Sequence, residues 1–294
     1  MMTELPLEQV RTLLAVVDEG TFDAAAAALH VTPSAVSQRV KALEQRTGRV
    51  LLQRTKPVIP TDSGAVLVRF ARQLARLEGD ARAELGLSGA GEPTRVSVAV
   101  NADTLATWFL AALTQVDGLC FELHREDEDH TAALLREGLV MAAVTSSADP
   151  VPGCSVRPLG RMRYLPAAAP EFAARHLDGP LRDLLPEAPV VVFDRKDDFQ
   201  DGFVRKLGGP AAGPLRHYVP TSEGFLDAVV AGLGWGMLPE AQAGPLLREG
   251  RLVLLAPRQW MDVRLYWQQW KLDSPALEAL AEAVTATAAR ALRR

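Results

Sequence analysis

The sequence predicts an α+β protein with more than one domain, and three observations support this prediction. The chain has 294 residues, which is enough for about two domains. Helix signals dominate the first third, whereas strands and helices alternate from residue 95 onward. A glycine-containing, hinge-like run, Ser88–Pro93, separates the two parts. We therefore expect a first domain at 1–61, a connecting helix and hinge at 62–92, and a second domain at 93–294.

The composition excludes several classes of protein. Hydrophobic residues make up 48% of the chain and charged residues 23%, which excludes a disordered or fibrous protein. No apolar run is long enough to predict a membrane span, and Met1–Leu7 lacks the pattern of a secretory signal. Cys120 and Cys154 lie far apart and outside any metal-ligand spacing, so we expect no disulfide framework and no metal site. A cytoplasmic protein without a cofactor is expected.

Three short helices are predicted at the N-terminus. Apolar residues recur at helical spacing over Leu7–Val17, and Gly20 ends that run. A second helix covers Phe22–Leu29. The third begins after Thr32, which reads as an N-cap because a proline follows at the first helical position, and it stops near Gly48. Three helices joined by such short turns are typical of a helix-turn-helix.

The third helix has a polar face suited to DNA. Val36, Val40 and Leu43 share one face and are expected to point inward. The opposite face carries short hydroxyls, an amide and cations, which can bond base edges and phosphates in the major groove. These outward residues, together with the neighbouring arginine, are Ser34, Ser37, Gln38, Lys41 and Arg39.

A basic turn follows the third helix. Val50–Leu52 and Val58–Ile59 are short apolar segments that flank it, as in a β-wing. Arg54 and Lys56 in the turn are placed to meet phosphates or the minor groove. Residues 34–56 carry a net charge of +5 in a chain whose total is −4, so the basic residues are concentrated where the DNA contact is predicted.

A long helix follows the wing. It starts at Thr61–Ser63, and its apolar residues recur in steps of three and four, as in a coiled-coil seam. The seam residues are Leu67, Phe70, Leu74, Leu77 and Ala81. A dimerising helix next to a wing predicts a homodimer with two reading heads and a two-fold related site on double-stranded DNA.

These residues resemble a known family. The run Leu7–Leu77, with AAAAALHVTPSAVSQRVKALEQRTG at its centre and LLQRT and PTDSG after it, is similar to the LysR-type transcriptional regulators. The resemblance implies a winged helix-turn-helix, a dimerising linker helix, an effector domain of two α/β lobes, assembly as homodimers or homotetramers, and RNA polymerase as a partner. It makes Arg54 a backbone contact, and it implies major-groove contacts from Thr32, Ser34, Ser37, Gln38 and Arg39. Related wings often carry a further arginine where this chain has Val58–Ile59.

Beyond residue 95, alternating strands and helices predict parallel βαβ units. The expected strands are Val96–Val100, Phe121–Arg125, Leu139–Thr145, Arg163–Ala167, Val190–Phe193, His217–Val219, Leu252–Leu255 and Leu265–Trp270. Two lobes joined by two crossings would resemble a periplasmic binding protein. We expect lobe I at about 93–163 plus 268–294 and lobe II at about 164–267, with the ligand between them.

Polar residues gather where these strands end, which is where open α/β sheets bind ligands. Hydroxyls and helix N-termini suit a carboxylate, and acidic side chains suit a cation, so a basic amino acid satisfies both sets. A capping or solvated role for any single acid stays open. The candidate effector residues are Asn101, Asp103, Thr104, Glu126, Asp127, Thr145, Ser146, Asp194, Asp198, Ser222 and Glu223.

A narrower resemblance covers nearly the whole chain. The segments NADTLATW, EDEDHT, VVFDRKDDFQ, PTSEGF and LYW are similar to the lysine- and arginine-sensing branch of the family, the ArgP or LysG branch. That branch activates the gene of a basic-amino-acid exporter. The resemblance therefore implies lysine or arginine as the effector of this chain.

Other functions remain as alternatives. P-loop, HExxH and GxSxG strings are absent, and no nucleophile pairs with a histidine, so no catalytic residue is assigned and no enzyme is expected. An enzyme carrying a DNA-binding head is therefore the weakest alternative. A ligand-independent architectural or replication-control DNA-binding protein is another. A LysR-type regulator with a different amino-acid effector is the third.

Overall fold

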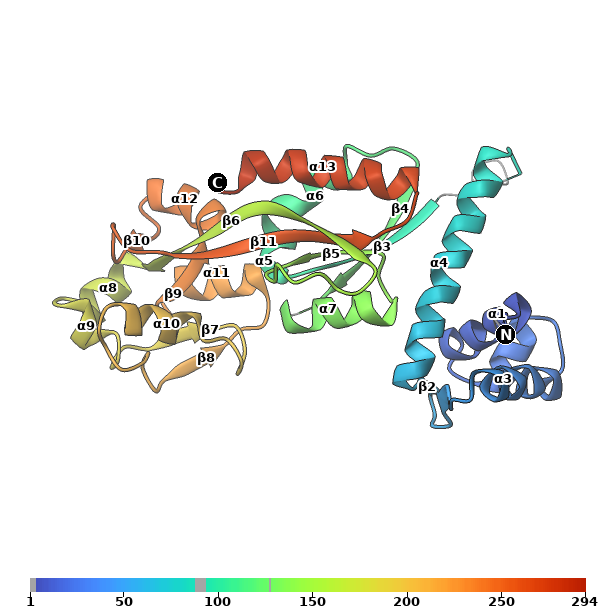
Figure 1. Cartoon of the computed structure of the whole chain (residues 1–294). Helices are drawn as coiled ribbons and strands as arrows, with labels where there is room; N and C mark the ends of the chain where they lie inside the picture. The colour runs from blue at the N-terminus through green and yellow to red at the C-terminus, as the bar shows by residue number, and fades with distance from the viewer. Residues whose placement is uncertain (1–3, 88–93, 127) are drawn as a thin grey trace.

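The computed structural model describes residues 4–87, 94–126 and 128–294. Figure 1 shows a small helical head, a long helix α4 and a larger body. The head consists of α1 (Leu7–Asp18), α2 (Phe22–Ala28) and α3 (Pro33–Thr47), close to the predicted limits. The Thr21 hydroxyl accepts the amide N–H of Ala24 at 3.1 Å and begins α2, while Gly48 ends α3 in the left-handed conformation.

The wing is shorter than the sequence predicts. Only β1 (Leu52–Gln53) and β2 (Ile59–Pro60) pair, antiparallel, with Leu52 opposite Pro60. Val50 lies outside the strand and is exposed, whereas Leu51 and Val58 are buried in the core of the head. Leu52 is buried there as well, so three apolar side chains hold the wing against the head, and the turn between its strands is exposed.

The long helix α4 (Asp62–Glu84) joins the head to the body and contacts both. Leu67 was predicted to lie in the dimerising seam of this helix. It is instead buried in the core of the head. The reason is that α4 packs against α1 along this face. Phe70 and Leu77 of the predicted seam are exposed, and Val66 beside them is exposed as well.

The body is built on a mixed sheet of seven strands in the order β10-β6-β11-β5-β3-β4, with β9 also paired to β6. Two of its strands, β6 and β11, are long, lie antiparallel and run the length of the body (Figure 1). A separate two-stranded sheet is formed by β7 and β8. The bounds are β3 Thr94–Val100, β4 Leu119–Arg125, β5 Ala142–Thr145, β6 Cys154–Ala168, β7 Val190–Val192, β8 Arg216–Tyr218, β9 Gly236–Pro239, β10 Val253–Leu254 and β11 Met261–Trp270.

Helices cover the sheets on both sides. A continuous helical run after β3 contains a π-helical stretch, η1, between α5 and α6, and α13 packs against this run. The helix α7 lies on the opposite side of the body from α13 and contacts α4 (Figure 1). The bounds are α5 Ala102–Thr104, η1 Leu105–Phe109, α6 Leu110–Leu113, α7 Glu128–Glu137, α8 Pro170–His176, α9 Leu181–Leu184, α10 Phe199–Lys206, α11 Ser222–Val230, α12 Glu240–Arg248 and α13 Pro275–Ala291.

The prediction of parallel βαβ units is right for part of the body. The pairs β3–β4, β3–β5 and β7–β8 are parallel. The pairs that β6 forms with β9, β10 and β11 are antiparallel, so these strands do not form parallel βαβ units with β6. The elements α9, α12 and β9 were not predicted. Within the described residues, no helix is long and apolar enough to cross a membrane.

Candidate functional site

The outer face of α3 is open to solvent at the predicted DNA-reading positions. Ser34, Gln38 and Lys41 are exposed, and Ser37 beside them is half-buried. Val36, Val40 and Leu43 lie in the core, as their spacing predicts. The helix therefore presents hydroxyl, amide and ammonium groups on one side, the groups that bond base edges and phosphates.

Two of the predicted DNA contacts already have partners within the head. The Thr32 hydroxyl accepts the amide N–H of Ala35 at 3.2 Å and caps α3. The Arg39 guanidinium forms an ion pair with Glu8 of α1, and its side chain is 28% exposed. Arg39 thus needs to exchange a carboxylate for a phosphate or base before it contacts DNA.

The wing carries its two predicted cations at its tip. Lys56 and Arg54 are both exposed. The Arg54 guanidinium lies 5.5 Å from the ring centre of Phe22, which orients it against α2. Both charges are therefore available to phosphates on the flank of the recognition helix.

A second candidate site is a cavity of about 560 Å³ in the body. It lies where the parallel strands end, between the α5 side of the seven-stranded sheet and the β7–β8 sheet. The predicted effector residues that line it are Asn101, Asp103, Glu126, Asp194, Asp198 and Ser222. Those six come from four different loops, so the structure brings together residues that the sequence separates by up to 121 positions.

Asp103 holds a central place in this cavity. It accepts a hydrogen bond at 2.8 Å from the Tyr164 hydroxyl and another at 2.6 Å from the Ser222 hydroxyl. Burial raises the pKa of Asp103, although these two hydrogen bonds oppose the increase. In the described part of the chain, no lysine or arginine forms an ion pair with this carboxylate. Asp103 is therefore a half-buried acid whose charged form a bound cation would stabilise.

The loop after β7 supplies the other acidic side of the cavity and is braced by its own carboxylates. Asp194 accepts the amide N–H of Lys196 at 2.7 Å, and Asp197 accepts that of Phe193 at 2.8 Å. Burial raises the pKa of Asp197, against the effect of its backbone hydrogen bonds. Asp194 therefore caps backbone N–H groups of its own loop, which is the role left open for it. Asp198 is largely exposed at the rim of the cavity.

Several predicted effector residues lie away from the cavity lining. Thr104 is fully buried behind it, and Glu223 lies on α11 outside the lining. Thr145 is buried and bonded to Ser147 and Gln268, so it braces the end of β5. Ser146 follows it outside the lining, and Asp127 lies outside the described residues.

Other lining residues were missed by sequence reasoning. Arg125 is the last residue of β4, and its guanidinium donates to the carbonyl of Pro220 at 3.4 Å. Lys196 adds a second cation, while Tyr164 and Phe199 add two rings that are tilted by 52° to each other, with centres 4.8 Å apart. Arg125 could have been found, because it ends a predicted strand. Tyr164 could not, because its place beside Asp103 depends on a contact across 61 residues.

Comparison with known proteins identifies the family. Residues 7–65 match the model for the bacterial regulatory helix-turn-helix protein, lysR family, and residues 90–289 match that for the LysR substrate binding domain. The chain belongs to the LysR family of transcriptional regulators. This LysR-type regulator has the DNA-binding head and the α/β domain predicted for it, and the family assignment from the sequence is confirmed.

Individual relatives of this LysR-type regulator match over nearly its whole length. The crystal structure of ArgP from Mycobacterium tuberculosis is 49% identical, with a TM-score of 0.92, and the match covers 97% of this chain and 98% of that one. Full-length LysG from Corynebacterium glutamicum with bound effector Arg is 43% identical, with a TM-score of 0.85, over 98% and 100% of the two chains. The lysine export transcriptional regulatory protein LysG from Corynebacterium glutamicum is 44% identical, and the match covers 97% of this chain and 98% of that protein.

The relatives of this regulator are transcriptional regulators. Among residues 4–87, 94–126 and 128–294, no group of three or more histidines, cysteines, aspartates or glutamates is arranged to hold a metal ion. The cysteines of the same ranges, Cys120 and Cys154, are free thiols. Burial raises the pKa of Cys154 to about 11, so this thiol is a packing residue.

Proposed function

We propose that this LysR-type regulator binds lysine or arginine in the 560 Å³ cavity and, in response, activates the gene of a basic-amino-acid exporter. The single observation that carries the proposal is the half-buried carboxylate of Asp103, which is held by hydroxyl groups from two sides of the cavity and pairs with no lysine or arginine of the described residues. The relatives add support, since one is a LysG with bound effector Arg and another is named for lysine export.

The charge of the cavity favours a cationic amino acid over a neutral one. Five carboxylates line it against two cations, Arg125 and Lys196. The carboxylates are Asp103, Glu126, Asp194, Asp197 and Asp198. A free amino acid with a basic side chain offers two positive groups to the acids and one carboxylate to Arg125 or Lys196. A neutral amino acid would leave part of the acidic lining without a counter-charge.

The cavity is also placed where a ligand can change the shape of the body. Asp103 and Asn101 lie at the start of α5, while Ser222 begins α11 on the other side. We propose that the antiparallel pair β6–β11 is the hinge between the two lobes, and that the effector stabilises one lobe arrangement. The free energy by which the effector shifts the two lobe arrangements then equals the difference between its binding free energies for them.

For the DNA, we propose that α3 enters the major groove and the wing contacts the flanking backbone. Ser34, Ser37, Gln38 and Lys41 read bases and phosphates, while Arg54 and Lys56 bind phosphates. Thr32 supports the DNA contact mainly by capping α3. Arg39 contacts DNA after its ion pair with Glu8 has broken. Two heads, paired through α4 as a homodimer or within a homotetramer, bind a two-fold related operator and bring the regulator beside RNA polymerase.

An operator selected from a random duplex pool by the purified protein tests this proposal. We expect a two-fold related sequence that is bound more tightly than random duplex at every salt concentration, and a shift in operator affinity or footprint with lysine or arginine but not leucine. Equal affinity for all duplexes, with no effect of any amino acid, would instead favour the ligand-independent architectural role. A response to leucine alone would replace the effector.

A further inference from the structure

The residues after α13 return to the long strand β6, which crosses from one predicted lobe to the other. Leu292 packs against the core of the body, and Arg293 forms an antiparallel bridge with Arg161 of β6. The amide N–H of Arg161 donates to the carbonyl of Arg293 at 2.7 Å, and the reverse bond measures 2.9 Å. We call residues 292–294 the C-terminal strap. Figure 1 shows this end of the chain between α12 and α13.

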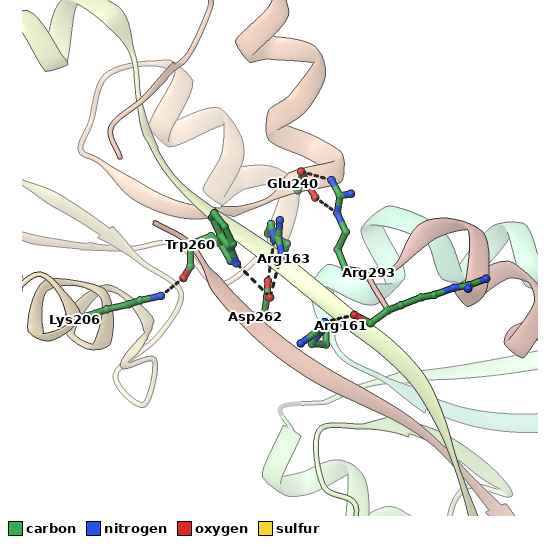
Figure 2. A network of polar contacts seen from close by, with 8 residues as sticks. Arg161, Arg163, Lys206, Glu240, Trp260, Asp262 and Arg293 are labelled. Atoms are coloured by element: carbon green, nitrogen blue, oxygen red, sulfur yellow. Dashed lines mark hydrogen bonds and ion pairs between the residues drawn. The ribbon is translucent and has the colours of Figure 1, made fainter. Parts of the chain in front are cut away.

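A glycine of β6 leaves room for the strap. Gly160 has φ +140°, and a Cβ atom added there would lie 2.9 Å from the carbonyl oxygen of Arg293 and 2.9 Å from the Cβ of Leu292. A larger residue at this position would therefore push the strap away from β6. The Arg161 guanidinium also donates to the main-chain oxygen of Arg294 (Figure 2). The strap is thus fixed to the crossing strand through its main chain.

One side chain of the strap reaches the second predicted lobe. The Arg293 guanidinium donates to both carboxylate oxygens of Glu240, at 3.0 and 2.7 Å (Figure 2). Glu240 is the first residue of α12. A two-point pair of this kind fixes orientation as well as distance. The other ion pair in Figure 2, between Arg163 and Asp262, lies within the β6–β11 pair itself.

The two helices beside this ion pair pack against different parts of the body. The helix α13 contacts η1, α6 and β3, whereas α12 contacts β9 and β6. A cavity of about 330 Å³ lies between them and is lined by residues of η1, α12 and the end of α13. Because no close-packed core fills this space, packing alone does not fix the separation of α12 and α13 there. The pair of Arg293 with Glu240 opposes a change in that separation.

The helix α12 also reaches the 560 Å³ cavity that we propose binds the effector. Pro239, directly before α12, lines that cavity. The Gln242 amide donates at 3.1 Å to the Ser222 hydroxyl, which donates at 2.6 Å to the carboxylate of Asp103. Asp103 belongs to predicted lobe I and Ser222 to predicted lobe II, so these bonds connect the lobes. The position of α12 therefore affects where Ser222 lies relative to Asp103.

We propose that the C-terminal strap is a latch that holds the two lobes in the arrangement that binds the effector. Arg293 and Glu240 are then positioning residues, because they fix α12, and through it Ser222, without touching the ligand. A protein whose latch is broken populates other lobe arrangements. Its apparent affinity for the effector falls in proportion to the fraction that stays competent to bind. The effect on the effector rests on the proposed function.

Calorimetric titration of the full chain with lysine tests the latch in a set of charge reversals. Arg293→Glu and Glu240→Arg each replace the ion pair by two like charges, so each should weaken lysine binding by about three- to fivefold. The double reversal Arg293→Glu/Glu240→Arg restores opposite charges and should bind lysine within about twofold of the unmodified protein. The single reversals change the net charge in opposite directions, so a long-range electrostatic effect on lysine would have opposite signs in them.

Arg157→Glu is the matched control. Arg157 also lies on β6 and pairs with Glu278 of α13 at 2.9 Å, but both residues belong to predicted lobe I. The two side chains are 41% and 50% exposed, against 56% and 34% for Arg293 and Glu240, so the pairs are comparable. Arg157→Glu should bind lysine as the unmodified protein does. Unchanged or tighter lysine binding in the single reversals, no recovery in the double reversal, or an equal loss in Arg157→Glu would overturn the latch.

Amide hydrogen exchange of the same proteins without ligand separates the latch from the effector proposal. The backbone N–H of Arg161, which is bonded to the strap, should exchange faster in the single reversals. It should exchange at the unmodified rate in the double reversal and in Arg157→Glu. If exchange follows this pattern and lysine binds to none of the proteins, the effector proposal fails while the strap contact stands. If lysine binds and the exchange of Arg161 is unchanged in the single reversals, the latch is wrong.

Discussion

At the scale of single residues, Asp103 carries the most information about ligand chemistry. Two hydroxyl groups hold its carboxylate in a buried position, and burial raises its pKa. A carboxyl group whose pKa is higher in the folded protein favours folding at pH values below its pKa in the unfolded chain. That contribution to stability is lost as the pH rises through the pKa of the folded state. Burial thus disfavours the charged form of Asp103, and a cationic ligand beside the carboxylate would favour it.

This reasoning predicts a proton release on binding. A cation beside Asp103 lowers the raised pKa of that carboxyl, so lysine binding at mildly acidic pH should release a fraction of a proton. Calorimetry in two buffers of different ionisation enthalpy measures the release. Asp103→Asn should abolish it and weaken lysine binding by about tenfold or more. Asp117→Asn, an exposed acid outside the cavity, should change neither. Release that persists in Asp103→Asn would assign the proton to another group.

The exposed residues of α3 predict a separation of specific from non-specific DNA binding. Gln38→Ala removes an amide that can read a base, so it should cost about 1–3 kcal/mol of operator binding and leave random-duplex binding nearly unchanged. Lys56→Gln should weaken both and lower the salt slope by about one. Gln45→Ala is the control, because Gln45 is exposed on the same helix but lies two turns further from the N-terminal end that reads bases. Equal losses from Gln38→Ala and Gln45→Ala on the operator would remove α3 from the reading role.

The sequence predicts the head well because its helices are delimited by local signals. Thr32 and Gly48 act within three or four residues, and each does in the structure what it was expected to do. Thr21 caps α2 in the same way. The cavity is predicted only in part, because strand ends can be located but side-chain directions cannot. Asp103 and Ser222 were found in this way, whereas the role of Tyr164 arises from a tertiary contact.

At the scale of elements, the crossing strand β6 is the feature that sequence reasoning missed most. It spans 15 residues, Cys154–Ala168, although only its last third was predicted. Pro158 and Gly160 lie in its first half and normally indicate a turn or loop. The structure accommodates them where the pairing with β11 shifts register, between Leu265 and Tyr266. An irregular antiparallel pair therefore occupies a segment for which no strand was predicted.

A contact between α4 and the body gives a prediction at the same scale. Gly138, just after α7, has φ +74°, and an added Cβ would lie 2.7 Å from the Cα of Arg69 in α4. Gly153 has a similar φ of +84°, but an added Cβ there meets nothing within 4 Å. Gly138→Ala should therefore destabilise the protein by about 1–3 kcal/mol more than Gly153→Ala, measured by thermal or denaturant unfolding. Equal costs would show that strain in φ explains both and that the α4 contact adds nothing.

At the scale of the whole molecule, α4 is the element that connects the head to the body. Arg69 donates to the carbonyls of Arg136 and Pro152 in the body, at 3.4 and 3.2 Å. Toward the head, Arg72 pairs with Asp18 at 2.6 Å and Arg11 pairs with Glu78 at 2.8 Å. A change in the lobes can therefore reach the head through a single rigid element.

The exposed stripe on α4 predicts how two copies associate. Val66, Phe70 and Leu77 are 56%, 37% and 40% exposed, which is unusual for residues of this size on one helix. Phe70→Glu/Leu77→Glu should convert a dimer to a monomer in light scattering and lower operator affinity at least tenfold, because one head binds where two did. Glu84→Gln on the same helix is the control. An unchanged oligomer in the double variant would place the interface elsewhere.

The central claim is that the body recognises a cationic amino acid, and comparison of lysine with norleucine tests it most directly. The two share a carbon chain and differ by the terminal ammonium group. Calorimetric titration of the intact protein at neutral pH, with arginine as a third ligand, measures that difference. The account predicts saturable binding of lysine or arginine, and affinity for norleucine at least about tenfold lower. Equal affinity for norleucine and lysine, or no binding of either basic amino acid, would contradict it.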